Sequence, residues 1–290
     1  MALTLEEKFE RVRDLRPIDD VFFEVLASDP RVCEEILRTI LKDPGLVVDK
    51  VAVQDSNRNL YGHSVRLDAL CVLGSGKHVN IEVQRADNDD HLRRARFNAS
   101  LITMTHSEPG GNYRNIPDVI IVYITEFDFL KQGKTVCHIR KVIEETGAFV
   151  DDGLSEVFVN TVIDDGTDIS ELMRCFIQKQ VDSPRFPVLT SAVRQLKETE
   201  GGVSEVCDAV QKYIDEAVKE ASAKSHAEGR AEGRTEGLAE GRTEGLAEGL
   251  AKGKISMLKS LLIDGVLSLA EAAKRAGLSE SEFRTAAAAC

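Results

Sequence analysis

The spacing of apolar residues changes once along the first third of the chain. Over residues 31–42 apolar side chains recur every three or four positions, which is the spacing of a helix with one buried face. From residue 46 apolar residues alternate with polar ones or run together. This second pattern predicts three strands with two turns between them: strands at 46–55, 63–73 and 78–84, with turns at 56–59 and 74–77.

The segments that follow complete a mixed α/β pattern. A long helix is expected from about residue 88 to 104, and the run of β-branched residues at 117–127 shows the weak alternation of a strand buried on both faces. Residues 135–145 and 156–164 are weaker strand candidates. The predicted fold class is therefore α/β: a mixed central sheet of four to six strands flanked by helices, followed by a helical C-terminal region.

Helical spacing returns after residue 168 and defines the remaining boundaries. Breaks in this helical part are expected at Pro184, at Pro187 and at the pair Gly201–Gly202. We therefore divide the chain into four parts: an α/β domain at 1–180, a helical extension at 181–225, a repeat at 226–254 and a small helical tail at 255–290.

The repeat has a period of four residues, "EGRAEGRTEGLAEGRTEGLAEGLAKG", with glycine at every fourth position from 229 to 253. Each glycine inside a helix costs about 1 kcal/mol relative to alanine, and glutamates four apart repel each other weakly. Two interpretations follow. The repeat is either a semi-flexible spacer or a helix whose glycine stripe lets a second helix approach, which would make residues 226–254 a site of homo-oligomerisation.

The tail carries the spacing of a helix-turn-helix. Ala273 would be the small residue of the first helix, Gly277 the turn and Phe283 the large apolar residue of the second helix. The second helix contains Glu280 and Glu282, and this charge suits DNA phosphates badly. The tail is therefore either a helix-turn-helix or a small helical cap for interactions with other proteins.

Composition restricts the class of protein. The net charge of -12 argues against a generally basic nucleic-acid binder but leaves room for a local basic groove. None of the six cysteines forms a CxxC pair, so a structural zinc site is not expected. The chain shows no signal peptide and no apolar run of about 20 residues, the length needed to span a bilayer, so we expect a cytoplasmic protein without a membrane partner.

Two acidic residues are placed opposite each other by the predicted hairpin. If the turn occupies residues 74–77, pairing residue 73 with 77 or 78 brings Asp68 opposite Glu82 or Val83. Gln84 shares the face of Glu82 because side chains alternate along a strand. Opposed carboxylates are destabilising unless a cation lies between them, and such oxygen ligands suit Mg²⁺, with Mn²⁺ as a substitute. The alternative is two unrelated acids on exposed strand faces.

Four elements in order resemble a known nuclease family. They are "DDVFFEVL" at 19–26, "RLDAL" at 66–70, "NIEVQ" at 80–84 and "RRARFNAS" at 93–100, and "GGNY" and "EFDF" follow downstream. Together they resemble the PD-(D/E)XK nuclease superfamily, and within it the recombination-promoting nuclease and transposase branch. That branch typically has glutamine where most of the superfamily has lysine. The resemblance implies a restriction-endonuclease-like core within 1–180 and hydrolysis of DNA phosphodiester bonds.

The resemblance also implies roles for individual residues. Asp68 and Glu82 would be catalytic metal ligands for Mg²⁺, joined by the main-chain carbonyl of Val83. Gln84 would take the catalytic position of the lysine, and Asp20 would be an additional acid. An amide has no useful basicity, so Gln84 cannot act as a general base and would orient water or donate to phosphate.

A local cluster of arginines supplies the expected contacts to DNA. Arg85, Arg94 and Arg96 would bind backbone phosphates, or they would form a solvated face beside neighbouring aspartates. The first functional hypothesis is a Mg²⁺-dependent DNA endonuclease that promotes recombination or transfer of a mobile element. The second is a catalytically weak or inactive scaffold that binds DNA or proteins and oligomerises through its C-terminal repeat.

Overall fold

The computed structural model describes residues 4–58, 64–88 and 90–289. The chain divides between Ile214 and Asp215 into two compact units, which are considered separately. No helix within the described ranges is both long enough and apolar enough to cross a membrane.

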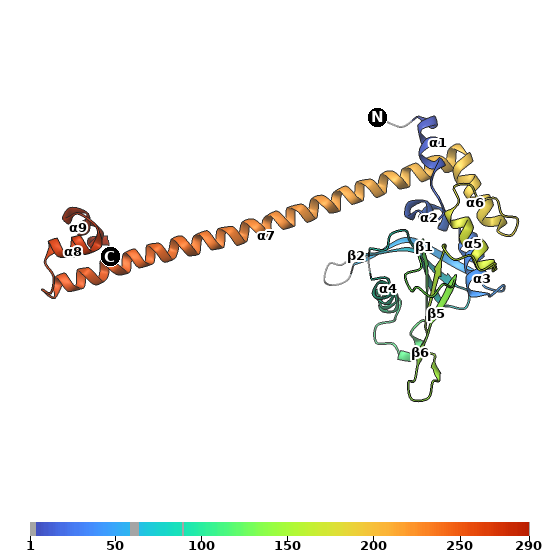
Figure 1. Ribbon diagram of the computed structural model, residues 1–290, viewed down its shortest axis with the longest axis horizontal. Coiled ribbons are helices and arrows are strands. Elements are labelled where there is room, and N and C mark those ends of the chain that lie inside the picture. The colour runs from blue at the N-terminus through green and yellow to red at the C-terminus, as the bar shows by residue number, and fades with distance from the viewer. Residues whose placement is uncertain (1–3, 59–63, 89, 290) are drawn as a thin grey trace. The chain divides into compact units, whose positions relative to one another are not determined.

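A six-stranded mixed sheet forms the centre of the first unit (Figure 1). β1, β2 and β3 pair antiparallel, β3, β4 and β8 pair parallel, and β5 closes the other edge antiparallel to β8. The strands in spatial order are β1 (Val48–Arg58), β2 (Ser64–Leu73), β3 (His78–Gln84), β4 (Val119–Thr125), β8 (Leu154–Asn160) and β5 (Val136–Ile139). The predicted fold class, a mixed sheet flanked by helices with a helical C-terminal region, is confirmed.

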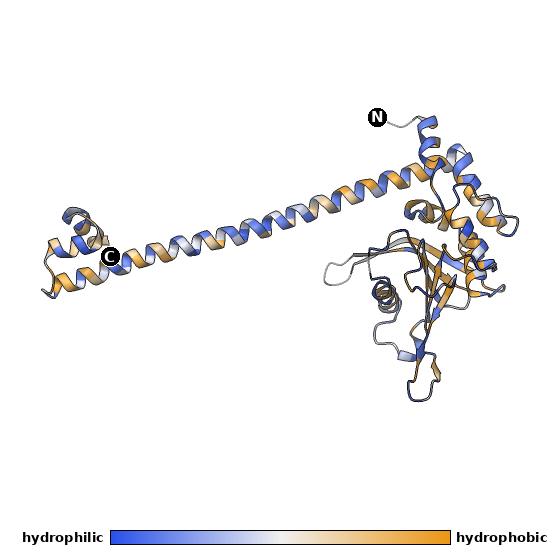
Figure 2. Ribbon diagram, viewed as in Figure 1, coloured by the Kyte–Doolittle hydropathy of each residue, from blue (hydrophilic) through white to orange (hydrophobic). Residues whose placement is uncertain are grey.

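Helices cover both faces of this sheet, and the strands are mostly hydrophobic in Figure 2. One face packs against a core built from α2 (Asp20–Ala27), α3 (Pro30–Leu41), α5 (Asp168–Ile177), α6 (Pro187–Glu198) and the start of α7 (Glu200–Ile263). The other face packs against α4 (His91–Thr105). β4 contributes to both cores: Val122 and Ile124 pack on one side, Ile121 and Tyr123 on the other. The prediction that this strand is buried on both faces is therefore confirmed.

Four helices of the first unit, α1 (Leu5–Arg13), α3, α4 and α5, begin at residues whose side chains cap them. Asp29 accepts a hydrogen bond from the N–H of Arg31 before α3, and Asp90 accepts one from the N–H of Arg93 before α4. The helix bounds are α1 (Leu5–Arg13), α2 (Asp20–Ala27), α3 (Pro30–Leu41), α4 (His91–Thr105), α5 (Asp168–Ile177) and α6 (Pro187–Glu198), with a 3₁₀ turn at Tyr113–Asn115.

Two predicted boundaries are wrong. The turn expected at 56–59 is partly strand, since β1 continues to Arg58, and its last residue lies outside the described ranges. The break expected at Gly201–Gly202 lies two residues earlier, at the extended Thr199 between α6 and α7 (Glu200–Ile263), and both glycines lie inside α7. A Cβ atom at Gly202 would lie 2.3 Å from the carbonyl oxygen of Gln195, so this glycine permits a close approach to α6 and does not end a helix.

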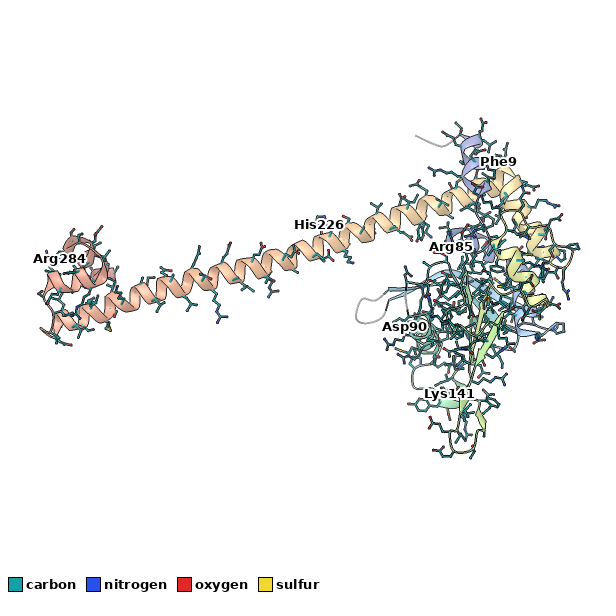
Figure 3. The ribbon with its side chains drawn as sticks, viewed as in Figure 1. Phe9, Arg85, Asp90, Lys141, His226 and Arg284 are labelled. Atoms are coloured by element: carbon teal, nitrogen blue, oxygen red, sulfur yellow. The ribbon has the colours of Figure 1, made fainter. Side chains whose placement is uncertain are left out.

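The weaker strand candidates are resolved into shorter elements. Residues 135–145 contain β5 and β6 (Lys141–Val142), and β6 forms a small hairpin with β7 (Phe149–Val150). Lys141 is labelled in Figure 3 within this hairpin region. The candidate at 156–164 overlaps β8, which is central to the sheet.

The second unit is entirely helical within the described residues. The four-residue repeat lies within α7, which is followed by α8 (Leu269–Ala276) and α9 (Glu280–Ala289). Ala273 and Phe283 are buried in a small core with Ile255 and Leu258. Gly277 ends α8 in the left-handed conformation, at a φ of 78°, where glycine carries no Cβ penalty.

Candidate active site

The β2–β3 hairpin places the two predicted acids opposite each other. Ala69 pairs with Ile81, and the N–H of Leu73 donates to the carbonyl of Lys77 across the turn. The next position along this register sets Asp68 across from Glu82, as predicted by pairing residue 73 with residue 77. The main-chain N–H of Val83 donates to Asp68 Oδ2 at 2.9 Å, which ties the carboxylate to the neighbouring strand.

Glu82 is fully buried, and Asp68 hydrogen-bonds to its carboxyl group in addition to three further side chains. Its Oε1 atom accepts hydrogen bonds from Asn80 Nδ2 at 3.0 Å and from Asn98 Nδ2 at 2.9 Å. Its Oε2 atom lies 3.4 Å from a guanidinium nitrogen of Arg94. A carboxylate that is buried and hydrogen-bonded in this way has a fixed orientation.

Asn98 was missed by the sequence analysis, although a signal for it exists. It lies on α4 one turn after Arg94 and is buried, whereas its neighbours Phe97 and Ser100 are exposed. A polar residue on the buried stripe of a helix needs a partner. That partner is Glu82, and this requirement would have identified the position.

Three carboxyl groups in this region have raised pKa values. Burial raises the pKa of Asp68 well above its usual range, and the nearby Glu82 carboxylate adds to the rise. Burial also raises the pKa of Glu82, against the opposing effect of Arg94. Asp20, in the first turn of α2, has its pKa raised mainly by desolvation of its carboxylate, and it in turn raises that of Asp68. Acidic groups that resist ionisation are therefore concentrated where β2, β3 and α2 meet.

Arg94 links Gln84 to Glu82. One guanidinium nitrogen lies 3.4 Å from Gln84 Oε1 and the other 3.4 Å from Glu82 Oε2. A guanidinium can only donate, so the amide oxygen of Gln84 must face Arg94 and its NH₂ group is left to donate elsewhere. Arg94 also lowers the pKa of Asp20, Asp68 and Glu82, so one cation acts on all three acids.

Residues 31–162, from α3 to just beyond β8, match the family model described as PD-(D/E)XK nuclease family transposase.

This segment is a PD-(D/E)XK nuclease family transposase domain.

The resemblance inferred from the sequence is thereby confirmed. The matched segment contains Asp68, Glu82, Gln84 and Arg94, and Asp20 precedes it. No curated protein and no solved structure matches the chain.

Two of the three predicted phosphate-binding arginines of the transposase domain have other partners than Asp68 and Glu82 in the described structure, although the charge of Arg85 lowers the pKa of Asp20. Arg85, labelled at the end of β3 in Figure 3, forms ion pairs with Asp19 at 2.9 Å and Glu126 at 3.5 Å. Arg96 is exposed on α4, and its charge lowers the pKa of Glu156 in β8. Of the three arginines, only Arg94 reaches both Glu82 and Gln84.

The ion pairs of Arg85 belong to a larger network beside the transposase-domain site. Arg16 donates to Glu126 at 2.5 Å, and this hydrogen bond lowers the pKa of Glu126. Arg16 also pairs with Asp19. The network connects the segment before α2 to the ends of β3 and β4. It explains why Arg85 is held in place by protein carboxylates, and it fixes the start of α2, where Asp20 lies.

The protein side chains here suit an ion that takes most of its ligands from water and substrate and only a few from the protein. Across residues 4–58, 64–88 and 90–289, no cluster of three or more His, Cys, Asp and Glu side chains could hold a metal. Two opposed carboxylates, Asp68 and Glu82, remain, with a buried Asn80 Oδ1 atom beside them that has no hydrogen-bond partner in this part of the chain. Mg²⁺ is commonly bound by one or two carboxylates together with phosphate oxygens, so these residues fit Mg²⁺ better than zinc or calcium.

Proposed function

We propose that the domain is a metal-dependent endonuclease that hydrolyses phosphodiester bonds in DNA and promotes recombination or transfer of a mobile element. The observation that carries the proposal is the opposition of Asp68 and Glu82 across the β2–β3 hairpin, with both pKa values raised by burial. Two acids confined in this way without a shared cation oppose folding. Such an arrangement is typical of a functional site.

Asp68 and Glu82 would hold Mg²⁺ or Mn²⁺, with the main-chain carbonyl of Val83 as a third protein ligand. The bound ion would supply acidity to a water molecule and stabilise charge on the phosphate. Asn80 and Asn98 would keep Glu82 in one orientation through its Oε1 atom, leaving Oε2 for the site. Asp20 would add negative charge at the edge of the site.

Gln84 would act as a donor in this reaction. Its amide oxygen faces Arg94, so its NH₂ group can orient the attacking water or bind a phosphate oxygen. Because an amide does not accept a proton at neutral pH, the proton released from water would pass to solvent. Arg94 would bind the DNA backbone, since guanidinium groups match phosphate geometry.

The deciding experiment is a plasmid-nicking assay with Mg²⁺, with Mn²⁺ and with EDTA. We expect metal-dependent nicking by the wild type, and a loss of at least about 100-fold in each of Asp68→Ala and Glu82→Ala, since each variant removes one proposed metal ligand. Glu156→Ala is the matched control, because Glu156 is an acid of the same sheet with a raised pKa but lies outside the site. Full nicking by Asp68→Ala and Glu82→Ala would exclude this site.

A second candidate function is a weakly active or inactive scaffold that binds DNA or proteins. The observation in its favour is Gln84, which brings neither charge nor basicity to the position where lysine is usual in the superfamily. This candidate predicts no cleavage stimulated by metal, and concentration-dependent oligomers that disappear when residues 226–254 are deleted. Analytical ultracentrifugation of the full chain and the deletion variant would test it alongside the nicking assay.

A further inference from the structure

The guanidinium of Arg94 lies beside the buried carboxylate of Glu82. This guanidinium lies 3.4 Å from Glu82 Oε2, the oxygen that the two asparagine side chains leave unbound, and 3.4 Å from Gln84 Oε1. The Arg94 side chain is 34% exposed, whereas that of Glu82 is 0% exposed. The guanidinium therefore bridges a buried acid and the solvent.

The contacts of Arg94 with Glu82 and Gln84 are long for charged hydrogen bonds. Guanidinium–carboxylate bonds are usually about 2.7–2.9 Å, as in the pair of Arg31 with Asp29 at 2.7 Å. At 3.4 Å, Arg94 balances the charge of Glu82 without a close bidentate contact. An arginine held in this way can exchange partners at low cost, because its long side chain has many rotamers and one end already faces water.

We propose that Arg94 is an exchangeable cation: it neutralises Glu82 while no divalent ion is bound, and it moves to a DNA phosphate when one binds. The inference rests on the proposed metal-dependent function. A divalent ion bound at Glu82 would repel a guanidinium beside the same carboxylate, so the two cations would compete for the Oε2 atom. An incoming phosphate supplies the new negative partner.

If Arg94 exchanges partners in this way, its contribution to DNA binding depends on the metal ion. An arginine that always contacts phosphate would show no such dependence. Without metal, Arg94 contributes little to DNA binding because it is engaged by Glu82 and Gln84. With metal, it contributes one phosphate contact. Metal and DNA binding are then coupled through one side chain, and the coupling acts equally in both directions.

The first test measures metal binding without DNA. Mn²⁺ is titrated into the full-length wild type, Arg94→Met and Arg93→Met, and free Mn²⁺ is followed by electron paramagnetic resonance. We expect Arg94→Met to bind Mn²⁺ on the order of tenfold more tightly than the wild type, because a competing positive charge has been removed. Arg93→Met is the charge-matched control: Arg93 is the preceding residue, is 78% exposed and pairs with Asp90. Its Mn²⁺ affinity is expected to stay within about twofold of the wild type.

A second test measures DNA binding against salt concentration, in EDTA and in Ca²⁺, with the DNA checked for cleavage afterwards. We expect Arg94→Met to reduce the slope of log K against log salt by about one in Ca²⁺ and by much less in EDTA. Equal reductions in both conditions would make Arg94 a fixed clamp and overturn the exchange.

A second variant and two further outcomes distinguish misfolding of a variant, failure of the exchange and failure of the proposed function. Arg94→Gln keeps hydrogen-bond donors for Glu82 and Gln84 but removes the charge, so it replaces Arg94→Met if the methionine variant fails to fold. Weaker or unchanged Mn²⁺ binding by these variants, beside a wild type that binds Mn²⁺ and nicks DNA, would overturn the exchange alone. A wild type that neither binds Mn²⁺ nor nicks DNA would overturn the proposed function and the exchange with it.

Discussion

At the scale of single residues, we expect the buried Asp68 to make the protein less stable as the pH rises. Its pKa is raised in the folded protein by burial and by Glu82, whereas in the unfolded chain it is about 4. Between these values the folded state binds more protons than the unfolded state, so stability falls with increasing pH. Asp68→Asn removes the charge and keeps the shape.

We expect Asp68→Asn in EDTA to match the wild type in melting temperature near pH 4 and to exceed it by several degrees at pH 8. Thermal unfolding followed by circular dichroism across this range tests the prediction. The stabilisation should appear together with loss of nicking, since the same charge that opposes folding would hold the metal. A constant difference at every pH would show that Asp68 acts through packing and not through its charge.

Asn98 carries a second prediction at this scale. Asn98→Ala leaves Glu82 Oε1 with one donor where it now has two, and losing a hydrogen bond to a buried charged group costs about 1–3 kcal/mol. Chemical denaturation should show this loss, together with reduced nicking. Ser100→Ala is the control, because Ser100 is exposed on the same helix and bonds only to the carbonyl of Arg96 in the described structure. Equal stability of Asn98→Ala and wild type would remove Asn98 from the site.

The sequence predicted these residues unequally, for physical reasons. Asp68 and Glu82 could be matched by counting outward from a short turn, because an antiparallel hairpin fixes its own register. The arginines could not be ranked in this way. Arg94 and Arg96 are about 200° apart around a helix, and their directions depend on where α4 begins and which face packs. The ion pairs of Arg85 could not be predicted, because its partners, Asp19 and Glu126, are distant in sequence. The phosphate-binding role of Arg85 stays a prediction.

At the scale of elements, strands and capped helices followed from local pattern, whereas boundaries set by tertiary contact did not. α3 has an Asp-Pro start and a clear apolar stripe, and both were visible in the sequence. Gly202 instead permits the close packing of α7 against Gln195 and Leu196, a requirement that no local propensity contains. The repeat shows the same limit: glycine propensity disfavours a helix, yet 226–254 are helical in α7. Whether this helix is a spacer or associates with another copy remains a prediction.

At the scale of the whole molecule, the catalytic proposal depends on only the first compact unit. Both large hydrophobic cores are formed by residues up to Val210, and all the site residues lie between Asp20 and Asn98. The unit also includes the first turns of α7, where Val203, Val206 and Cys207 are buried in the core beside the sheet. A truncation should therefore be tolerated after these turns and not before them.

We expect a chain of residues 1–214 to fold, to keep the melting temperature of the first unit and to retain the nicking activity of the full protein. A chain of residues 1–199 is the matched comparison, because it lacks the three buried side chains of α7. Exposing the apolar surface that they cover should cost about 3–6 kcal/mol, which is a large part of the stability of an ordinary domain. Chemical denaturation and the plasmid assay, run on both chains, measure the difference. If residues 1–214 prove as unstable as residues 1–199, the nuclease unit requires the repeat and tail for folding, and the two compact units are not independent.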